Sequence, residues 1–147
     1  MGSKESEKSY EVTIQDQNDA QIRSVVLQVF RNWSSRNPDA NDPLYLADDR
    51  TVLFDVTPMK DVGWDHQKRR LHGVFREFEK FDMEPTGDLE IHHLGDVGWA
   101  TMTWKSKILL KNGSMMSREG RGTFVLKGAF EMACGPRPHF RSLTTMT

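Results

Sequence analysis

Asp55 is the residue whose position most directly suggests chemistry. It ends a compact β-type run, Thr51–Phe54, that leads into a loop containing Pro58 and Gly63. A carboxylate at the end of a buried strand can serve as a general base where the strand borders an apolar pocket. It can equally fix the loop by accepting hydrogen bonds from backbone N–H groups. The sequence leaves both roles open for Asp55.

The histidines are the second set of candidates. His72 borders the apolar stripe of an expected helix, from which it could reach a cavity as an acid or base, or lie partly exposed on the helix flank. His66 lies six residues earlier, which is not the spacing of three or four that brings two metal ligands to one helix face. His92 and His93 are adjacent on an expected strand, so they point to opposite faces. We therefore expect no metal site and no cofactor.

The tryptophans indicate where a ligand could bind. Four of them in 147 residues suggest a large apolar cavity or an interface. Trp33, Trp64 and Trp104 could line such a cavity, with Phe54 as a further ligand contact. Core packing is the alternative for each tryptophan taken singly. The expected partner is a small hydrophobic molecule.

The composition narrows the class of protein. The charges nearly balance, with 20 basic and 21 acidic residues, and no run of like charge indicates a nucleic-acid groove. No apolar run approaches the roughly 20 residues that a membrane span needs, and the polar N-terminus does not resemble a signal peptide. Cys134 is the single cysteine, which excludes a disulfide framework within one chain and fits a reducing compartment. We expect a cytoplasmic protein with no nucleic-acid or membrane partner.

The helices that must position the candidates follow from the spacing of apolar residues. One apolar stripe predicts a helix over about 19–36, begun by a capping box of Asn18 and Gln21. A second stripe predicts a helix over about 65–81. A short helical turn is expected between them, at Pro43–Ala47. About three helices therefore precede the rest of the chain.

Strands dominate the second half of the sequence. They are expected at 51–55, 89–94, 97–110 and 115–127. Helices followed by an antiparallel meander predict an α+β fold with the helices on one face of a curved sheet. We divide the chain into a polar, disordered leader over 1–15, one domain over 16–134 and an irregular tail over 135–147.

The hairpin between the two long strands predicts which side chains share a face. A two-residue turn at Asn112-Gly113 pairs Trp104 with Arg121 and Ser106 with Glu119, and cross-strand partners share a face. Glu119 and Arg121 then lie on the cavity side, where they would pair with each other or bind a polar group of the ligand, because an unpaired buried charge is costly. The alternatives are a solvated end of the sheet, or a one-residue bulge that reverses the face. Trp99 falls on the outer face.

Several stretches together resemble a known family. They are the stripe Val25–Trp33 ending at Asn-Pro-Asp, the strand ADDRTVLFDVTP, the helix start GWDH, and the segments LGDVGWAT and REGRGTFVL. They resemble the SnoaL-like branch of the nuclear transport factor 2-like superfamily over about residues 18–127. The resemblance implies a cone of curved sheet closed by three helices, a pocket at the wide end, and a homodimer formed through the outer face of the sheet.

The resemblance identifies a fold more specifically than a reaction. In ketosteroid isomerase, an Asp base works with a Tyr and a protonated Asp. Here Phe30, Arg31 and Arg121 stand near those partner positions, so the isomerase machinery is not carried over. At the other end of the chain, Ala129–Cys134 either supplies a shortened last strand or leaves the pocket wall incomplete.

Two functions lead, and hydrolysis of an epoxide is a third, weaker option because the network of carboxylates and arginine that it needs is only partly visible. The first is a small-molecule-binding protein that could transfer a proton on a hydrophobic substrate. Asp55 or His72 would be the acid or base, and Arg121 would stabilise an anionic oxygen. The alternative is a non-catalytic dimerisation or ligand-binding module whose pocket is filled by its own side chains.

Overall fold

The computed structural model describes residues 2–45, 49, 51–55, 59–128 and 140–146. The helices are α1 (Gly2–Ser34), the 3-10 helix η1 (Pro38–Asn41) and α2 (Trp64–Phe75). The strands are β1 (Val52–Phe54), β2 (Lys60–Val62), β3 (Phe78–Pro85), β4 (Glu90–Leu94), β5 (Val97–Leu110), β6 (Met115–Gly128) and β7 (Phe140–Met146). This is the predicted α+β class. In the described residues two α-helices and one 3-10 helix replace the expected three helices.

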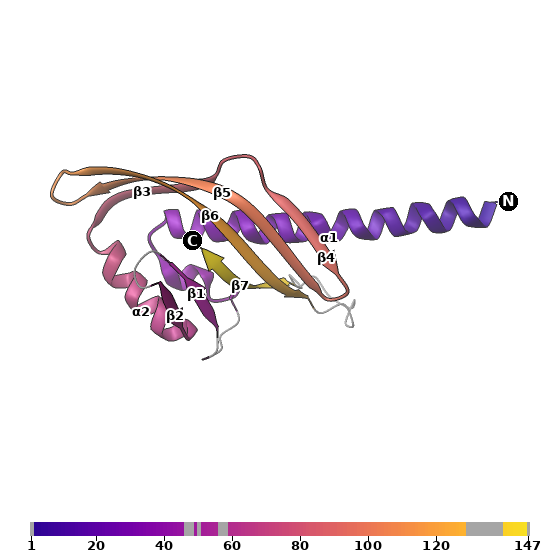
Figure 1. The fold of residues 1–147 in the computed structure, drawn as a ribbon, viewed down its shortest axis with the longest axis horizontal. Coiled ribbons are helices and arrows are strands. Elements are labelled where there is room, and N and C mark those ends of the chain that lie inside the picture. The colour runs from indigo at the N-terminus through magenta and orange to yellow at the C-terminus, as the bar shows by residue number, and fades with distance from the viewer. Residues whose placement is uncertain (1, 46–48, 50, 56–58, 129–139, 147) are drawn as a thin grey trace.

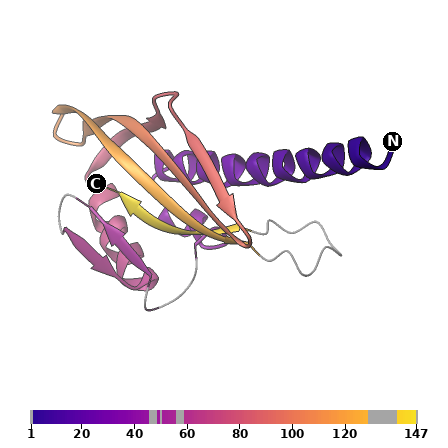
Figure 2. The same ribbon diagram turned by 45° about the vertical axis from the view of Figure 1, so that its right-hand side comes forward.

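One antiparallel sheet forms the body of the molecule. Its strands follow the order β3-β5-β6-β7, and β4 pairs with the other half of the β5 edge. The helix α1 lies along one face of this curved sheet, and its N-terminal part extends beyond the sheet edge (Figures 1 and 2). The separate hairpin β1–β2 lies with α2 at one end of the sheet (Figure 1).

The side chains of the predicted apolar stripe pack α1 against the sheet. Its members are buried: Ile22, Val25, Val26, Val29, Phe30 and Trp33. The helix begins at Gly2 rather than at the expected capping box, so helical backbone runs through most of the segment predicted as a leader. After Gly2 this segment has no proline or glycine, and its Glu, Lys and Gln residues favour helix. None of the helices in the described residues is both long and apolar enough to span a bilayer.

The helix predicted over 65–81 was too long. Helix α2 ends at Phe75, and the following apolar residues belong to strand β3. The misleading feature is a bulge between Phe78 and Lys80. It inserts one extra residue, so that Phe78 and Phe81 face the same side of the sheet although they are three apart. Spacing of three is a helical pattern in sequence, and here a bulged strand produces it.

The predicted hairpin register was wrong by one residue. Gly113 N–H donates to the Leu110 carbonyl, and Leu110 N–H donates to the Ser114 carbonyl, so the loop has three residues rather than two. Among the described non-glycine residues only Arg36 has a positive φ, whereas a two-residue type I′ turn needs one at Asn112. The geometry matches a tight turn followed by a glycine bulge, with Gly113 at φ 89°.

The shift reverses the two faces of β6. Trp104 pairs with Gly120 and Ser106 with Arg118, while Arg121 pairs with Thr103. Because side chains alternate along a strand, a slip of one residue moves every side chain of β6 to the opposite face. Gly120 therefore takes the place expected for Arg121, and Arg118 takes the place expected for Glu119.

The end of the chain is also more ordered than predicted. Strand β7 pairs with β6 from Gly128↔Phe140 to Gly122↔Met146 and extends the sheet. The irregular tail expected over 135–147 is corrected for these residues, whose threonines and phenylalanine favour strand. Ala129–Cys134 lies outside the described residues.

The short helical turn also differs from the prediction. It lies at Pro38–Asn41 rather than Pro43–Ala47, with Asn37 as its N-cap. Proline is well suited to the first position of such a turn, since its φ is fixed near the helical value and its missing N–H would have no partner there. The leader, domain and tail boundaries otherwise stay predictions.

Candidate functional site

A cavity of about 300 Å³ lies between α2, the C-terminal part of α1 and the sheet. Its apolar wall comprises Trp33, Leu53, Leu71, Val74, Phe75, Phe78, Phe81, Met83, Trp104 and Ile108. Its polar residues are Asp55, Arg70, Ser106, Arg118 and Glu119. A concave, mainly apolar site with a few polar groups is the usual form of a small-molecule site.

Half of the candidate residues lie at this cavity. Trp33, Asp55, Trp104 and Glu119 contribute to its lining. Asp55 follows β1 and is half-buried, while Trp33 and Trp104 come from α1 and β5 and are buried. The sequence therefore predicted two walls of the cavity and the carboxylate at its edge.

His72 and Arg121 lie elsewhere. His72 Nε2 is 3.0 Å from Asp39 Oδ1 in a solvent-accessible pair at the other side of α2. Arg121 is exposed on the outer face of the sheet, opposite Thr103. Neither is among the described residues that line the cavity.

Trp64 and Phe54 also lie away from the cavity lining. Trp64 stacks on Tyr45, with ring centroids 4.2 Å apart, and its Nε1 donates to Asp42 Oδ1 at 2.8 Å. Phe54 is 38% exposed, because alternation along β1 turns it away from Leu53, which lines the cavity. Of the three tryptophans expected to converge, Trp33 and Trp104 therefore line the cavity, and Trp64 belongs to a separate aromatic stack.

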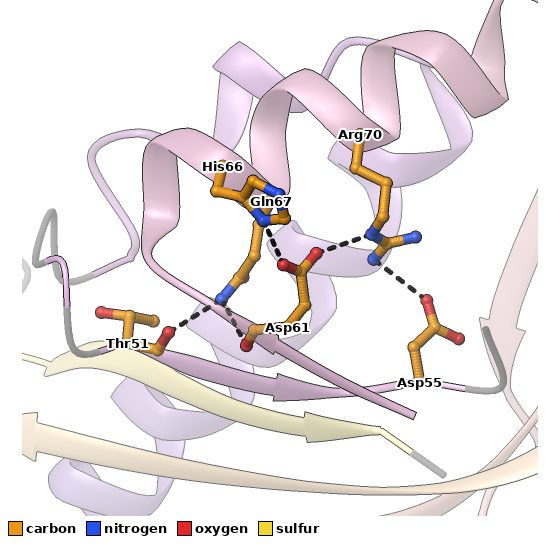
Figure 3. Close-up of polar contacts among 6 residues, drawn as sticks. All are labelled: Thr51, Asp55, Asp61, His66, Gln67 and Arg70. Carbon is orange, nitrogen blue, oxygen red and sulfur yellow. Dashed lines mark hydrogen bonds and ion pairs between the residues drawn. The ribbon is translucent and has the colours of Figure 1, made fainter. Parts of the chain in front are cut away.

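A buried carboxylate organises the polar side of the cavity. The side chain of Asp61, on β2, is 0% exposed. Its Oδ2 accepts a hydrogen bond from Arg70 Nε at 2.6 Å, and its Oδ1 is hydrogen-bonded to His66 Nδ1. Arg70 also donates from its terminal nitrogen to Asp55 Oδ2 at 3.2 Å (Figure 3). One guanidinium thus joins the buried carboxylate to the carboxylate at the cavity.

Gln67 fastens the same hairpin to α2. Its side-chain amide donates to the Thr51 carbonyl at 3.0 Å and to the Asp61 carbonyl at 3.4 Å (Figure 3). Gln67 is completely buried, and Gly63 N–H donates to the same Thr51 carbonyl. The backbone of β1–β2, and with it Asp55, is held against the helix that carries Arg70.

The pKa of Asp61 reflects this environment. Burial alone would raise the pKa of its carboxyl group, but the hydrogen bonds and charges of Arg70 and His66 outweigh burial and lower it. A carboxyl group with a lowered pKa in the folded state stabilises the fold above its ordinary value of 3.8 and loses that contribution as the pH falls below it.

We therefore expect an acid-dependent stability difference between the wild type and Asp61→Asn. Urea unfolding at a series of pH values should give a constant difference above about pH 5, since the carboxyl group is then ionised in both states. The difference should shrink below about pH 4, because the carboxyl group of the unfolded chain then becomes protonated while that of the folded protein, with its lowered pKa, is still ionised. Asp42 and Asp88 also have lowered pKa values, but both proteins contain them, so they cancel. A difference that stays constant down to pH 3 would contradict this account.

Sequence reasoning missed Asp61, Arg70 and Arg118. Asp61 lies in a strand of three residues, which is too short to show a pattern. A usable signal existed on α2, where Gln67 and Arg70 are three apart and so lie on one helix face. Two polar residues beside an apolar stripe indicate a buried polar partner. Among the described residues, no cluster of three or more His, Cys, Asp or Glu could hold a metal ion.

The architecture and its cavity define a class of protein. Solved structures with a similar fold include members of the nuclear transport factor 2-like superfamily. One, a superfamily member from Salmonella enterica serovar Typhimurium, has a TM-score of 0.74 and 14% identity, covering 93% of this chain and 92% of that one. No family model matches the sequence, and no curated protein matches it.

Two further solved structures carry proposed activities. A candidate scytalone dehydratase from Novosphingobium aromaticivorans has a TM-score of 0.73 and 8% identity, covering 93% of this chain and 86% of that one. A candidate dehydratase of the same superfamily from Streptomyces avermitilis has a TM-score of 0.72 and 12% identity, covering 90% and 98%. At these identities the likeness shows the fold, and the chain has the nuclear transport factor 2-like fold that its sequence resembled.

Proposed function

We propose that the chain binds a small hydrophobic molecule in the cavity beside Asp55. The observation that carries this proposal is the open cavity of about 300 Å³ with a mainly apolar wall. Its size is that of the smaller ligand pockets in proteins. The charged residues at the cavity, Asp55, Arg70 and Arg118, would orient a polar group of the ligand.

Asp55 is the proposed acid–base group for a proton transfer on that ligand. Its carboxylate would accept a proton from a carbon or oxygen atom of the substrate and return it at a second position. Arg70 holds Asp55 through the 3.2 Å hydrogen bond to Oδ2. Arg118 would stabilise the negative charge that develops on the substrate, the role that the sequence assigned to Arg121. Two of the solved structures with this fold are candidate dehydratases. Dehydration, the removal of water from a substrate, also requires proton transfer.

The alternative was a module with a self-filled pocket. That alternative required Trp33, Trp64 and Trp104 to interlock and fill the cone. Trp64 instead stacks on Tyr45, and a cavity of about 300 Å³ remains beside the other two tryptophans. These observations favour ligand binding. The homodimer through the outer face stays a prediction, supported by exposed Leu94, Val97 and Met115, whose register positions lie on that face.

A thermal-shift screen of small hydrophobic compounds, including carboxylic acids and ketones, tests the proposal. A ligand at a hundred times its dissociation constant stabilises the folded state by about 2.7 kcal/mol. For a chain of this size that corresponds to an increase in Tm of roughly 5–10 °C. The wild type should show such an increase with at least one compound, and Arg118→Ala and Asp55→Asn should show a smaller one.

Arg121→Ala is the matched control. Arg121 and Arg118 are exposed arginines three apart on β6, but only Arg118 lines the cavity. Arg121→Ala should therefore keep the full increase in Tm. Equal losses in the two arginine variants would contradict binding in this cavity, and so would a screen in which no compound stabilises the wild type. For the catalytic step, a turned-over ligand should bind Asp55→Asn without reacting.

A further inference from the structure

A second hollow, of about 290 Å³, lies where three segments far apart in the sequence meet. Its cations are Arg36, which follows α1, Arg76, which follows α2, and Lys111, in the loop between β5 and β6. We call this space the basic hollow. Phe75 and Phe78 belong to its lining and also to that of the cavity beside Asp55, so the two spaces are neighbours. The remaining lining residues of the basic hollow are Ser35 and His72.

Hydrogen bonds to the backbone hold the three segments together. Arg36 Nη1 donates to the Phe78 carbonyl at 2.7 Å, which ties the end of α1 to the start of β3. Lys111 N–H donates to the Glu77 carbonyl at 3.0 Å, which ties the β5–β6 loop to the same place. The basic hollow is therefore a fixed part of the fold, and it brings cations from three elements together.

The backbone of Arg36 is unusual. Its φ is 62°, and it is the one non-glycine residue in the described part of the chain with a positive φ. A residue just after a helix often adopts this conformation, but glycine is the usual choice because a Cβ is strained there. Strained backbone positions cluster at ligand-binding and catalytic sites. Arginine at this position retains a strain that glycine would remove, so its side chain is the feature that the position gains.

The positive charge of the basic hollow is not balanced by the protein. Its two arginines and its lysine form no ion pair with a carboxylate of the described residues. The neighbouring Glu77 is exposed and pairs with none of them, and His72 already pairs with Asp39. The C-terminal ends of α1 and α2 offset part of the charge, because each end carries roughly −0.5 elementary charge. An excess of about two positive charges is left.

We propose that the basic hollow binds a phosphate-type dianion, either inorganic phosphate or the phosphate group of a small organic ester. Such a group carries about −1.5 to −2 charges at pH 7, which matches the excess. The planar guanidinium groups of Arg36 and Arg76 suit the paired oxygens of a phosphate, and Lys111 adds a compact charge. The ring of Phe78 would contact the organic part of an ester.

Isothermal titration calorimetry with phenyl phosphate and benzenesulfonate tests the proposal. The two probes share a phenyl ring, but the sulfonate carries a single negative charge. At low salt, where screening is weak, the wild type should bind phenyl phosphate about tenfold more tightly, because the second charge meets the excess of cations. Inorganic phosphate distinguishes the two sources. Equal affinity for it indicates free phosphate, and weaker affinity indicates an ester.

Arg36→Gly is the sharpest variant, because it removes the guanidinium and the backbone strain together. It should weaken binding of phenyl phosphate about tenfold, the effect of losing a hydrogen bond to a charged group. Its free energy of unfolding should stay close to that of the wild type, since relief of strain offsets the lost hydrogen bond to Phe78. Lys111→Gln should weaken binding in the same direction. If Arg36 serves only to end α1, Arg36→Gly leaves binding unchanged.

Two further variants are controls. Lys107→Gln removes an exposed charge of β5 that lies outside the lining of the basic hollow, and it should leave the affinity unchanged. Arg118→Ala should also leave it unchanged, because Arg118 lines the other cavity. The inference is overturned if the wild type does not bind phenyl phosphate, if it binds both probes equally, or if Arg36→Gly and Lys111→Gln bind as the wild type does. A loss of binding in Arg118→Ala would place the probe in the cavity beside Asp55 and overturn it as well.

Discussion

Replacing Asp61 with alanine is expected to destabilise the fold by about 3–5 kcal/mol, the usual cost of removing one partner of a buried ion pair. The side chain of Asp61 is 0% exposed and that of Arg70 is 17% exposed. Removal of the carboxylate would leave the guanidinium largely buried, with its hydrogen bond to Asp55 as the one side-chain contact that remains to it among the described residues. The free energy of unfolding from urea denaturation measures the loss.

Asp65→Ala is the matched control for this prediction. Asp65 is in the first turn of α2, close in sequence to the same network, but its side chain is 91% exposed. Its removal should change the free energy of unfolding by less than about 0.5 kcal/mol, as is usual for surface substitutions. If the two variants lost similar amounts of unfolding free energy, the burial of Asp61 would not be what determines its contribution to stability.

The second large effect is expected from Gly120→Ala. A Cβ at this position would lie 2.4 Å from Trp104 Cζ2 and 2.6 Å from Cε2, much closer than van der Waals contact allows. The indole is buried and rigid, so the backbone of β6 or the ring must move. We expect a loss of about 1–3 kcal/mol from overpacking, measured by urea unfolding.

Alanine substitutions at two other glycines, Gly73 and Gly98, serve as comparisons for the effect of Gly120→Ala on stability. An added Cβ at Gly73, on α2, meets nothing within 4 Å, so Gly73→Ala should stabilise the protein by about 0.5 kcal/mol through helix propensity. At Gly98 the nearest atom is Ile22 Cδ1 at 2.6 Å, the far end of a side chain that can adjust. Gly98→Ala should therefore cost less than Gly120→Ala. A Trp104→Leu background should reduce the cost at Gly120, and an unchanged cost there would exclude the indole as its cause.

The sequence predicted the larger features of the fold because these depend on long, regular patterns. The buried stripe of α1 and the alternation of β5 extend over many residues, so single exceptions do not obscure them. The cavity residues on these elements, Trp33 and Trp104, were identified correctly as lining a cavity. Asp55 was placed at the edge of the pocket for a different reason, because it directly follows a short apolar strand.

The errors arose where one residue decides the outcome. The bulge after Phe78 gave a strand the spacing of a helix, and the glycine bulge at Gly113 moved Arg118 rather than Arg121 to the cavity face. Asp61 escaped notice because its importance comes from partners on another element. Arg70 and His66 approach it only after α2 has packed on the β1–β2 hairpin. Local sequence indicates such contacts only indirectly, through polar residues such as Gln67 and Arg70 beside an apolar stripe.

The number of residues in the loop at 111–113 decides which side chains of β6 face the cavity. An odd number and an even number present opposite faces of the strand. With three residues in the loop, Arg118 and Gly120 lie opposite Ser106 and Trp104, which line the cavity, whereas Arg121 lies opposite Thr103 on the outer face. Deleting one loop residue while keeping the strands paired would exchange these sets. Arg121 would then lie opposite Trp104, in place of the glycine that accommodates the Trp104 ring. Relatives of this chain that differ by one residue at this turn would therefore bind different ligands on an unchanged fold.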